Sequence, residues 1–213
     1  MAEEEKRMDA HSGWYTFGRF LGRVLLRTIC PTRYYHTERL QGDAPFIVIA
    51  NHTSWMDPVA IGSAIRRYEV VFLGKSELVK NKFVGWLLDK LHMIVVDRHK
   101  SDMEAMRACL RALKQGCILG IFPEGTRYHE GIMENTDSGV GLIALRSNVP
   151  VYPVYVDRRV LPFRVTHAWA GEPIPYDDIR ADGVNTETSA RFMARITETY
   201  RKMMADAQKK KNG

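Results

Sequence analysis

The chain has 213 residues, of which 45% are hydrophobic and 26% charged, so it is long enough and apolar enough for one packed globular domain with at most a small appendage. Its 31 Lys and Arg exceed its 25 Asp and Glu, and the net charge of +6 suits an anionic partner such as nucleic acid, a phosphorylated metabolite or an acidic membrane surface. No run approaches about 18 consecutive apolar residues, which excludes a predicted membrane-spanning helix.

The first twelve residues, beginning "MAEEEKRMDA", are predicted to be a flexible, solvated tip without the pattern of a signal peptide. Three cysteines follow, Cys30, Cys109 and Cys117, and no two of them are close in sequence. This spacing predicts neither a disulfide framework nor a Cys-based zinc site, and it favours a reducing, cytosolic compartment.

Residues 13 to 30, "GWYTFGRFLGRVLLRTIC", are predicted to form an amphipathic helix. Arg19, Arg23 and Arg27 recur every four positions and form one basic stripe on a helix, whereas most apolar side chains fall on the other side. Tyr15 and Leu26 break this pattern. The segment therefore resembles an interfacial membrane anchor, but an ordinary surface helix that packs on its own domain explains the pattern equally well.

From residue 45 onward, short β-rich runs alternate with helical patterns. Helices are predicted at 101–116 and 187–208, where apolar residues recur at helical spacing. The predicted strands are "PFIVIA" (45–50), "VVFL" (70–73), "MIVV" (93–96), "CILGIF" (117–122) and "VPVYPVYV" (149–156). Strands that are apolar throughout and alternate with helices predict an α/β fold, with a mostly parallel central sheet flanked by helices.

The segment "NHTSWMDP" (51–58) follows the first of these strands and places His52 five positions before Asp57. Ligands of open α/β sheets bind at the carboxyl ends of strands, which favours a functional interpretation. An aspartate bonded to one ring nitrogen would make the other nitrogen a better base. The structural alternative is that Asp57 caps a helix that starts with Pro58, and that His52 is an ordinary packed imidazole.

The segment "GIFPEGTR" (120–127) follows another apolar strand and should open on the same edge of the sheet. Gly125 permits a close backbone approach to a ligand, Thr126 offers a hydroxyl, and the planar fork of Arg127 suits a phosphate or carboxylate. Glu124 is positioned to hold a substrate hydroxyl or to orient Arg127. On its own the segment is also consistent with a simple turn.

Two further cations follow predicted strands, Lys75 after "VVFL" and Arg98 after "MIVV". Each by itself would be read as solvated surface charge. Together with the two segments above, they predict a general base beside a site for an anionic, phosphorylated substrate.

Other kinds of site lack support in the sequence. Ser138 does not lie in a G-x-S-x-G elbow, and no phosphate-binding glycine loop is present. The seven histidines show no metal-binding spacing, so no metal site is predicted. Cys109 and Cys117 fit a helix face and a strand interior, which indicates core positions.

These residues resemble the glycerolipid acyltransferases, and among them most closely the 1-acylglycerol-3-phosphate O-acyltransferases. The family motif N-H-x-x-x-x-D corresponds to Asn51, His52 and Asp57, and the K-x-E-L block leading to an arginine corresponds to Lys75 through Arg98. F-P-E-G-T-R is present unchanged at 122–127, and the fourth block, V-P-V-x-P-V, stands as "VPVYPV" at 149–154. The four blocks occur in family order.

The resemblance implies transfer of a fatty acyl group from acyl-CoA or acyl-carrier protein to the sn-2 hydroxyl of the lysophospholipid 1-acylglycerol 3-phosphate, giving phosphatidic acid. It implies that His52 is the general base and that Asp57 orients it. The phosphate of the acceptor would be bound by Glu124, Gly125, Thr126 and Arg127, with help from Lys75 and Arg98. Neither a metal nor a cofactor is implied, because the thioester is a substrate and attack is direct.

The resemblance divides the chain into a flexible tip (1–12), an amphipathic membrane-association helix (13–34) and an acyltransferase domain (35–213). Many members of the family begin with hydrophobic helices long enough to enter the bilayer deeply, whereas three arginines interrupt residues 13–30 here. This departure favours peripheral or monotopic attachment, expected at the cytoplasmic face of the cell membrane. Two alternatives stay open: an acyltransferase acting on another lysolipid or an amino-lipid, and a non-catalytic, basic lipid-binding protein. Nucleic acid is not an expected partner, because the basic residues follow strand ends and do not cluster on one recognition helix.

Overall fold

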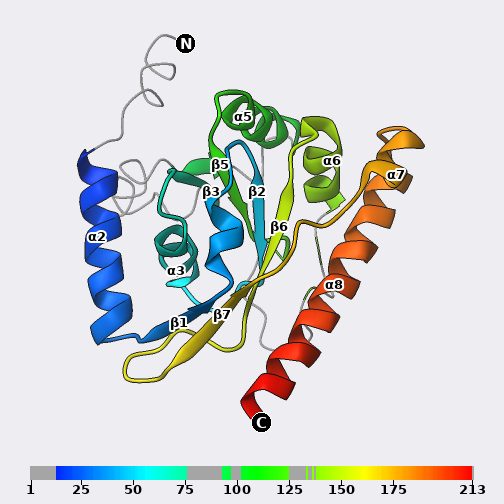
Figure 1. Ribbon diagram of the computed structural model, residues 1–213. Helices are drawn as coiled ribbons and strands as arrows, with labels where there is room; N and C mark the ends of the chain where they lie inside the picture. The colour runs from blue at the N-terminus through cyan, green and yellow to red at the C-terminus, as the bar shows by residue number, and fades with distance from the viewer. Residues whose placement is uncertain are drawn as a thin grey trace.

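The computed structural model describes residues 13–75, 93–96, 102–124, 133, 136 and 138–212. These residues form one seven-stranded sheet with the order β1-β7-β6-β2-β5-β3-β4 (Figure 1). The strands are β1 (Thr32–Tyr35), β2 (Ile47–Ala50), β3 (Val70–Lys75), β4 (Ile94–Val96), β5 (Ile118–Ile121), β6 (Val151–Val156) and β7 (Thr166–Ala170). Every neighbouring pair in this sheet is parallel except β6 and β7, which confirms the predicted α/β fold with a mostly parallel sheet.

Helices cover both faces of the sheet (Figure 1). They are α2 (Gly13–Thr28), α3 (Asp57–Ala64), α5 (Asp102–Lys114), α6 (Ser138–Ser147), α7 (Asp177–Ala181) and α8 (Thr186–Asn212), with a 3-10 helix η1 (Thr37–Gln41). Apolar side chains of α3 pack on one face of the sheet, and those of α5, α6 and α8 pack on the other. The three helices expected from sequence periodicity, at 13–30, 101–116 and 187–208, correspond to α2, α5 and α8.

Strand β2 lies in the middle of the sheet and is buried on both sides. Ile47 and Ile49 belong to the core beneath α5, α6 and α8, whereas Val48 and Ala50 belong to the core beneath α3. This alternation follows from the period of two along a strand, and it explains why the run is apolar throughout. The chain therefore leaves the core directly after Ala50, where "NHTSWMDP" begins.

Cys109 has the core position that the sequence predicts, whereas Cys117 lies just before β5 and not inside the strand. Cys30 and Cys109 are buried, and Cys117 is partly buried. Burial raises the pKa of the Cys109 thiol to about 12. Burial, and secondarily the charge of Glu69, raises the pKa of Cys117 to about 11. Thiols with such values stay protonated at neutral pH and are poor nucleophiles.

Helix α2 packs on the protein with two of its three arginines, Arg19 and Arg23, turned inward, whereas Arg27 is exposed. The Arg19 guanidinium donates to the carbonyl of Tyr68 at 3.3 Å, and that of Arg23 donates to the carbonyl of Ser63 near the end of α3 at 3.4 Å. Tyr15 and Leu26, the two residues outside the predicted pattern, are the buried ones, with 5% and 3% exposure.

The opposite side of α2 is apolar and exposed. Between 42% and 63% of the surface is accessible at each of four residues, which recur at helical spacing: Phe17, Phe20, Leu21 and Val24. A surface helix of a water-soluble protein shows the reverse arrangement, with apolar residues toward the core. No helix in the described part of the chain has the length and apolar character needed to cross a bilayer.

Gly22 accounts for the close approach of α2 to α3. A Cβ atom at this position would lie 2.6 Å from Cγ1 of Val59, closer than atoms of real side chains approach. The glycine that weakens helix propensity in the sequence is therefore required by the packing of the two helices.

Tyr200 of α8 ties the last helix to the centre of the sheet. Its hydroxyl donates to the carbonyls of Ile49 in β2 at 2.5 Å and Val154 in β6 at 3.1 Å. Burial raises the pKa of this phenol well above its ordinary value, so the group stays a neutral donor. These contacts lie one or two residues before the strand ends that carry the candidate site.

Candidate functional site

The first part of the site is the junction between β2 and the segment that follows it. The side-chain amide of Asn51 donates to the carbonyl of Val156 at 2.9 Å and accepts from the Val156 N–H at 2.8 Å. Asn51 is buried, with 1% exposure. Its amide thus satisfies the backbone at the end of β6 and fixes the start of the next segment, 51–57, against two neighbouring strands.

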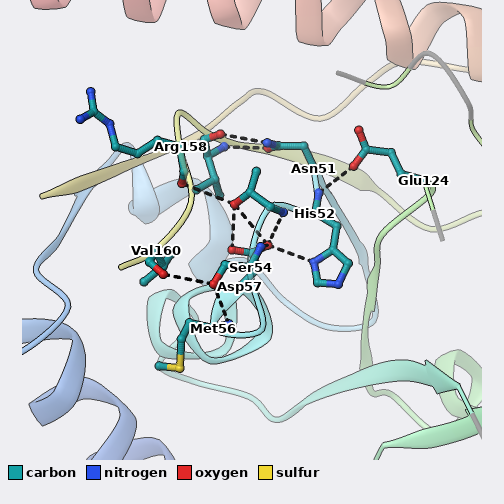
Figure 2. Close-up of polar contacts among 10 residues, drawn as sticks. Asn51, His52, Ser54, Met56, Asp57, Glu124, Arg158 and Val160 are labelled. Atoms are coloured by element: carbon teal, nitrogen blue, oxygen red, sulfur yellow. Dashed lines mark hydrogen bonds and ion pairs between the residues drawn. The ribbon is translucent and has the colours of Figure 1, made fainter. Parts of the chain in front are cut away.

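The carboxylate of Asp57 is the centre around which segment 51–57 turns (Figure 2). Its Oδ2 accepts the backbone N–H groups of Thr53 and Ser54, each at 2.6 Å. Its Oδ1 accepts the Thr53 hydroxyl at 3.2 Å. The side chain has no solvent exposure, and these donors provide the partners that a buried carboxylate requires.

The predicted helix-capping role of Asp57 is wrong. Met56 occupies the N-cap position of α3 and Asp57 the first helical position, next to Pro58. The Asp57 carboxylate turns back toward the N–H groups of Thr53 and Ser54, which precede the helix. It therefore orders the loop that carries the histidine.

His52 bonds to the same carboxylate oxygen. Its Nδ1 lies 3.0 Å from Oδ2 of Asp57, as Figure 2 shows. Because an ionised carboxylate only accepts, this contact assigns the proton of a neutral imidazole to Nδ1 and leaves the lone pair on Nε2. The ring also stacks on Phe122 with centroids 4.4 Å apart. Its side chain is 19% exposed, so the imidazole is oriented by the protein and still reaches the surface.

Glu124 holds His52 from the other side, through the backbone. Its Oε2 accepts the N–H of His52 at 2.8 Å, and its Oε1 accepts the N–H of Met133 at 2.9 Å. The carbonyl of Met133 in turn accepts the hydroxyl of Thr197 in α8 at 3.2 Å. Glu124 is 8% exposed. Its contact with substrate stays a prediction, whereas its contact with the His52 backbone is a feature of the fold.

The contacts of Glu124 yield a prediction for Glu124→Gln. An amide nitrogen cannot accept a hydrogen bond, so one of the two backbone N–H groups would lose its partner. We expect the free energy of unfolding to fall by about 1–3 kcal/mol, the cost of an unsatisfied buried donor. Turnover should fall as well, because the backbone that carries the imidazole is released.

Denaturant unfolding measures the first effect, and Glu198→Gln is the matched control because Glu198 is exposed on α8. Equal unfolding midpoints for the two variants would show that the Glu124 carboxylate does not hold these N–H groups.

Of the remaining predicted site residues, only the backbone of Lys75 lies in the described part of the structure. The parallel strands β2, β5, β3 and β4 are consecutive neighbours, so their carboxyl ends meet along one rim of the sheet. Lys75 is the last residue of β3, and its side chain is outside the described part of the structure, as are Arg98, Gly125, Thr126 and Arg127. The prediction that four strand ends meet at one rim is confirmed, whereas the contacts of these cations stay predictions.

A second His–Asp pair lies near the end of β6 and was not expected from the sequence. Nδ1 of His167 is 3.1 Å from Oδ2 of Asp157, and the Asp157 side chain is 3% exposed. The His167 ring packs against Tyr35 and Trp169, with centroids 5.9 and 5.6 Å away. Because the two residues are ten positions apart and lie outside any motif, no local signal marked them. The His167–Asp157 pair can therefore serve as a control for the His52–Asp57 pair in mutagenesis.

The sheet and the rim define an α/β protein with an oriented His–Asp pair at the carboxyl ends of its parallel strands. Residues 32–157 match the family model described as Acyltransferase, which covers more than half of the chain. The chain belongs to this acyltransferase family.

Two curated relatives carry more specific names. A 1-acyl-sn-glycerol-3-phosphate acyltransferase of Bacillus subtilis (strain 168) is 32% identical over 131 residues, which are 62% of this chain and 65% of that protein. A lyso-ornithine lipid O-acyltransferase of Rhodobacter capsulatus is 34% identical over 80 residues, 37% of this chain and 28% of that protein. The chain thus matches about two thirds of one relative's length and less than a third of the other's.

The fold is shared with a solved structure. The crystal structure of the 1-acyl-sn-glycerophosphate acyltransferase PlsC from Thermotoga maritima matches with a TM-score of 0.69 and 23% identity. The match covers 92% of this chain and 78% of that one. It supports the architecture described above.

Proposed function

We propose that this protein transfers a fatty acyl group from acyl-CoA or acyl-carrier protein to the sn-2 hydroxyl of 1-acylglycerol 3-phosphate, producing phosphatidic acid. The observation that carries the proposal is the His52–Asp57 pair, which lies at the rim where the carboxyl ends of the parallel strands meet. Of the two His–Asp pairs in the structure, this is the one that lies in the N-H-x-x-x-x-D segment, which supports a catalytic role for His52 over a purely lipid-binding function.

In the proposed mechanism His52 is the general base. Its Nε2 takes the proton of the acceptor hydroxyl while the oxygen attacks the thioester carbonyl, so that a C–O bond forms. Asp57, bonded to Nδ1, stabilises the imidazolium produced in this step. The C–S bond then breaks, and the departing thiolate takes the proton from the imidazolium. The proton of the acceptor hydroxyl thus ends on the departing thiol, His52 returns to its neutral form, and no covalent enzyme intermediate is formed.

The acceptor phosphate is assigned to Arg127, Lys75 and Arg98, with Gly125 and Thr126 providing backbone and hydroxyl contacts. We expect Arg127→Ala to weaken binding of the phosphorylated acceptor by roughly 1.5–3 kcal/mol, the value of a hydrogen bond to a charged group. This corresponds to a rise in KM of about 10- to 150-fold.

Steady-state kinetics with lysophosphatidic acid and with a lysolipid that has an uncharged head group measures this effect. The KM for the uncharged acceptor is the internal control. An unchanged KM for lysophosphatidic acid would show that Arg127 is not the phosphate ligand.

Membrane attachment is assigned to α2. Its exposed apolar face, Phe17, Phe20, Leu21 and Val24, is the side turned away from the protein, while Arg19 and Arg23 bond inward to backbone carbonyls. This orientation favours the interfacial anchor over the ordinary surface helix. The proposed location is the cytoplasmic face of the cell membrane, with peripheral or monotopic attachment.

The test is acyl transfer by purified, detergent-supported protein, with acyl-CoA and acyl-carrier protein as separate donors. Phosphatidic acid formed from lysophosphatidic acid establishes the reaction and names the donor. The likeness to a lyso-ornithine lipid acyltransferase makes lyso-ornithine lipid the second acceptor to test. If no product forms with any donor and any lysolipid acceptor, the proposed enzymatic function is contradicted and a lipid-binding protein is favoured.

A further inference from the structure

The connection between β6 and β7, residues 157–165 (the β6–β7 loop), carries the most exposed large apolar side chain of the described residues. Phe163 is 84% exposed. Its φ of 59° lies in the left-handed region, which is unfavourable for an aromatic residue. Its backbone N–H donates to the carbonyl of Ile29 at 2.6 Å. The fold thus holds the aromatic ring outward at the end of the segment that follows α2.

The base of the same loop is firmly packed. Val160 is 3% exposed and shares a small core with Leu26, Cys30 and Ala60, from α2, the segment after it and α3. An exposed aromatic tip on a buried base is a rigid projection and not a loose loop. Figure 1 places this loop, in yellow, beyond the C-terminal end of α2.

The loop is also bonded to the segment that carries the catalytic pair. The hydroxyl of Ser54 donates to the carbonyl of Val160 at 3.2 Å, and that of Thr53 donates to the carbonyl of Arg158 at 3.4 Å (Figure 2). Thr53 and Ser54 are the residues whose N–H groups hold Asp57. Whatever the loop binds is therefore held at a fixed position relative to His52.

The chemistry of the loop surface identifies its partner. Arg159 and Arg164 lie in the same loop as Phe163 and are exposed, and Ile29, whose carbonyl accepts the Phe163 N–H, is itself 43% exposed. Ile29 directly follows α2, so the backbone bond from Phe163 to its carbonyl ties the loop to the end of that helix. An aromatic tip among arginines suits a lipid interface, where the ring enters the acyl region and the guanidinium groups meet anionic head groups.

We propose that the β6–β7 loop is a second membrane contact, which inserts Phe163 into an anionic bilayer beside α2. This inference deepens the membrane part of the proposed function. Attachment at α2 alone would leave the protein free to rotate about the helix axis. A second contact, bonded to segment 51–57, fixes the rim of the sheet at the level of the lipid head groups.

The experiment is sedimentation of the full chain with vesicles of phosphatidylcholine, with and without phosphatidylglycerol. The variant is Phe163→Ser, and the control is Val184→Ser, since Val184 is an exposed apolar residue (38%) in the connection between α7 and α8. Loss of one buried aromatic ring should weaken vesicle binding by roughly tenfold or more, and Phe163→Trp should retain it. Arg159→Ser and Arg164→Ser should each weaken binding about fivefold, only on anionic vesicles.

The readout does not depend on catalysis, so the outcomes separate the two proposals. If Phe20→Ser weakens vesicle binding while Phe163→Ser binds like the wild type, attachment through α2 stands and the loop inference is overturned. A change from dimer to monomer in Phe163→Ser without vesicles would assign the surface to a second copy of the chain and also overturn the inference. Weakened binding with unchanged turnover of a soluble short-chain acceptor supports the inference.

Discussion

Replacing His52 by alanine is expected to lower kcat by about 100-fold or more, the typical contribution of a general base. The fold should persist, because the imidazole is partly exposed and its neighbours Asn51 and Asp57 keep their own backbone partners. The measurement is acyl transfer at saturating acceptor, with circular dichroism to confirm folding.

The second His–Asp pair provides the matched control. His167→Ala removes an imidazole from an equally short contact with a buried aspartate, 3.1 Å against 3.0 Å. It should leave kcat near the wild-type value. Equal losses in both variants, or near-normal turnover in His52→Ala, would remove His52 from the role of base.

Asp57→Asn is expected to lower kcat by roughly 10²- to 10⁴-fold, the range from a lost acid–base group to a lost orienting aspartate. The amide oxygen can occupy the position of Oδ2 and still accept from Thr53 and Ser54, while the amide nitrogen faces the Thr53 hydroxyl. The substitution therefore keeps the shape of the loop and removes the charge that stabilises the imidazolium. The free energy of unfolding should fall by about 1.5–3 kcal/mol, because charge-assisted bonds become neutral ones.

Asp157→Asn tests whether the loss of activity follows from the loss of stability. This variant also removes the charge of a buried aspartate bonded to a histidine, so a comparable loss of stability is expected with turnover retained. The double variant His52→Ala/Asp57→Asn should be scarcely less active than His52→Ala, since the two residues act as a unit. Additive losses in kcat would show that His52 and Asp57 contribute to catalysis independently.

The rim of the sheet was predictable because the relevant information is local. Runs such as "FIVIA" and "CILGIF" identify buried strands, and His52, Lys75 and Glu124 lie within or directly after such runs. Parallel strands with intervening helices then bring these ends to one edge. Strands β1 and β7 were not predicted, since "TRYY" and "THAWA" mix polar and aromatic residues at the side of the sheet beyond the antiparallel β6–β7 pair.

What could not be predicted depends on contacts between distant residues. The hydrogen bond between Asn51 and Val156 joins residues 105 positions apart, and no periodicity in the sequence predicts it. The capping prediction for Asp57 failed because two nearby N–H groups in the preceding loop competed for the same carboxylate. For α2 the periodicity separated Arg19 and Arg23 from the apolar residues Phe17, Phe20, Leu21 and Val24, but it could not say which of these two sides meets the protein. That depends on the carbonyls of Ser63 and Tyr68, which the arginines reach only in the folded chain.

The anchoring of Tyr200 has a consequence for the order in which the protein matures. Its hydroxyl reaches back 151 residues to the carbonyl of Ile49, and the same helix holds Met133 and, through it, Glu124. A nascent chain still within the ribosome carries the whole N-H-x-x-x-x-D motif long before this helix has been made. The motif is therefore synthesised before the hydrogen bonds from α8 that support it can form. Until α8 has been synthesised, Ile49 and Met133 lack the hydrogen bonds that Tyr200 and Thr197 donate to them in the folded protein.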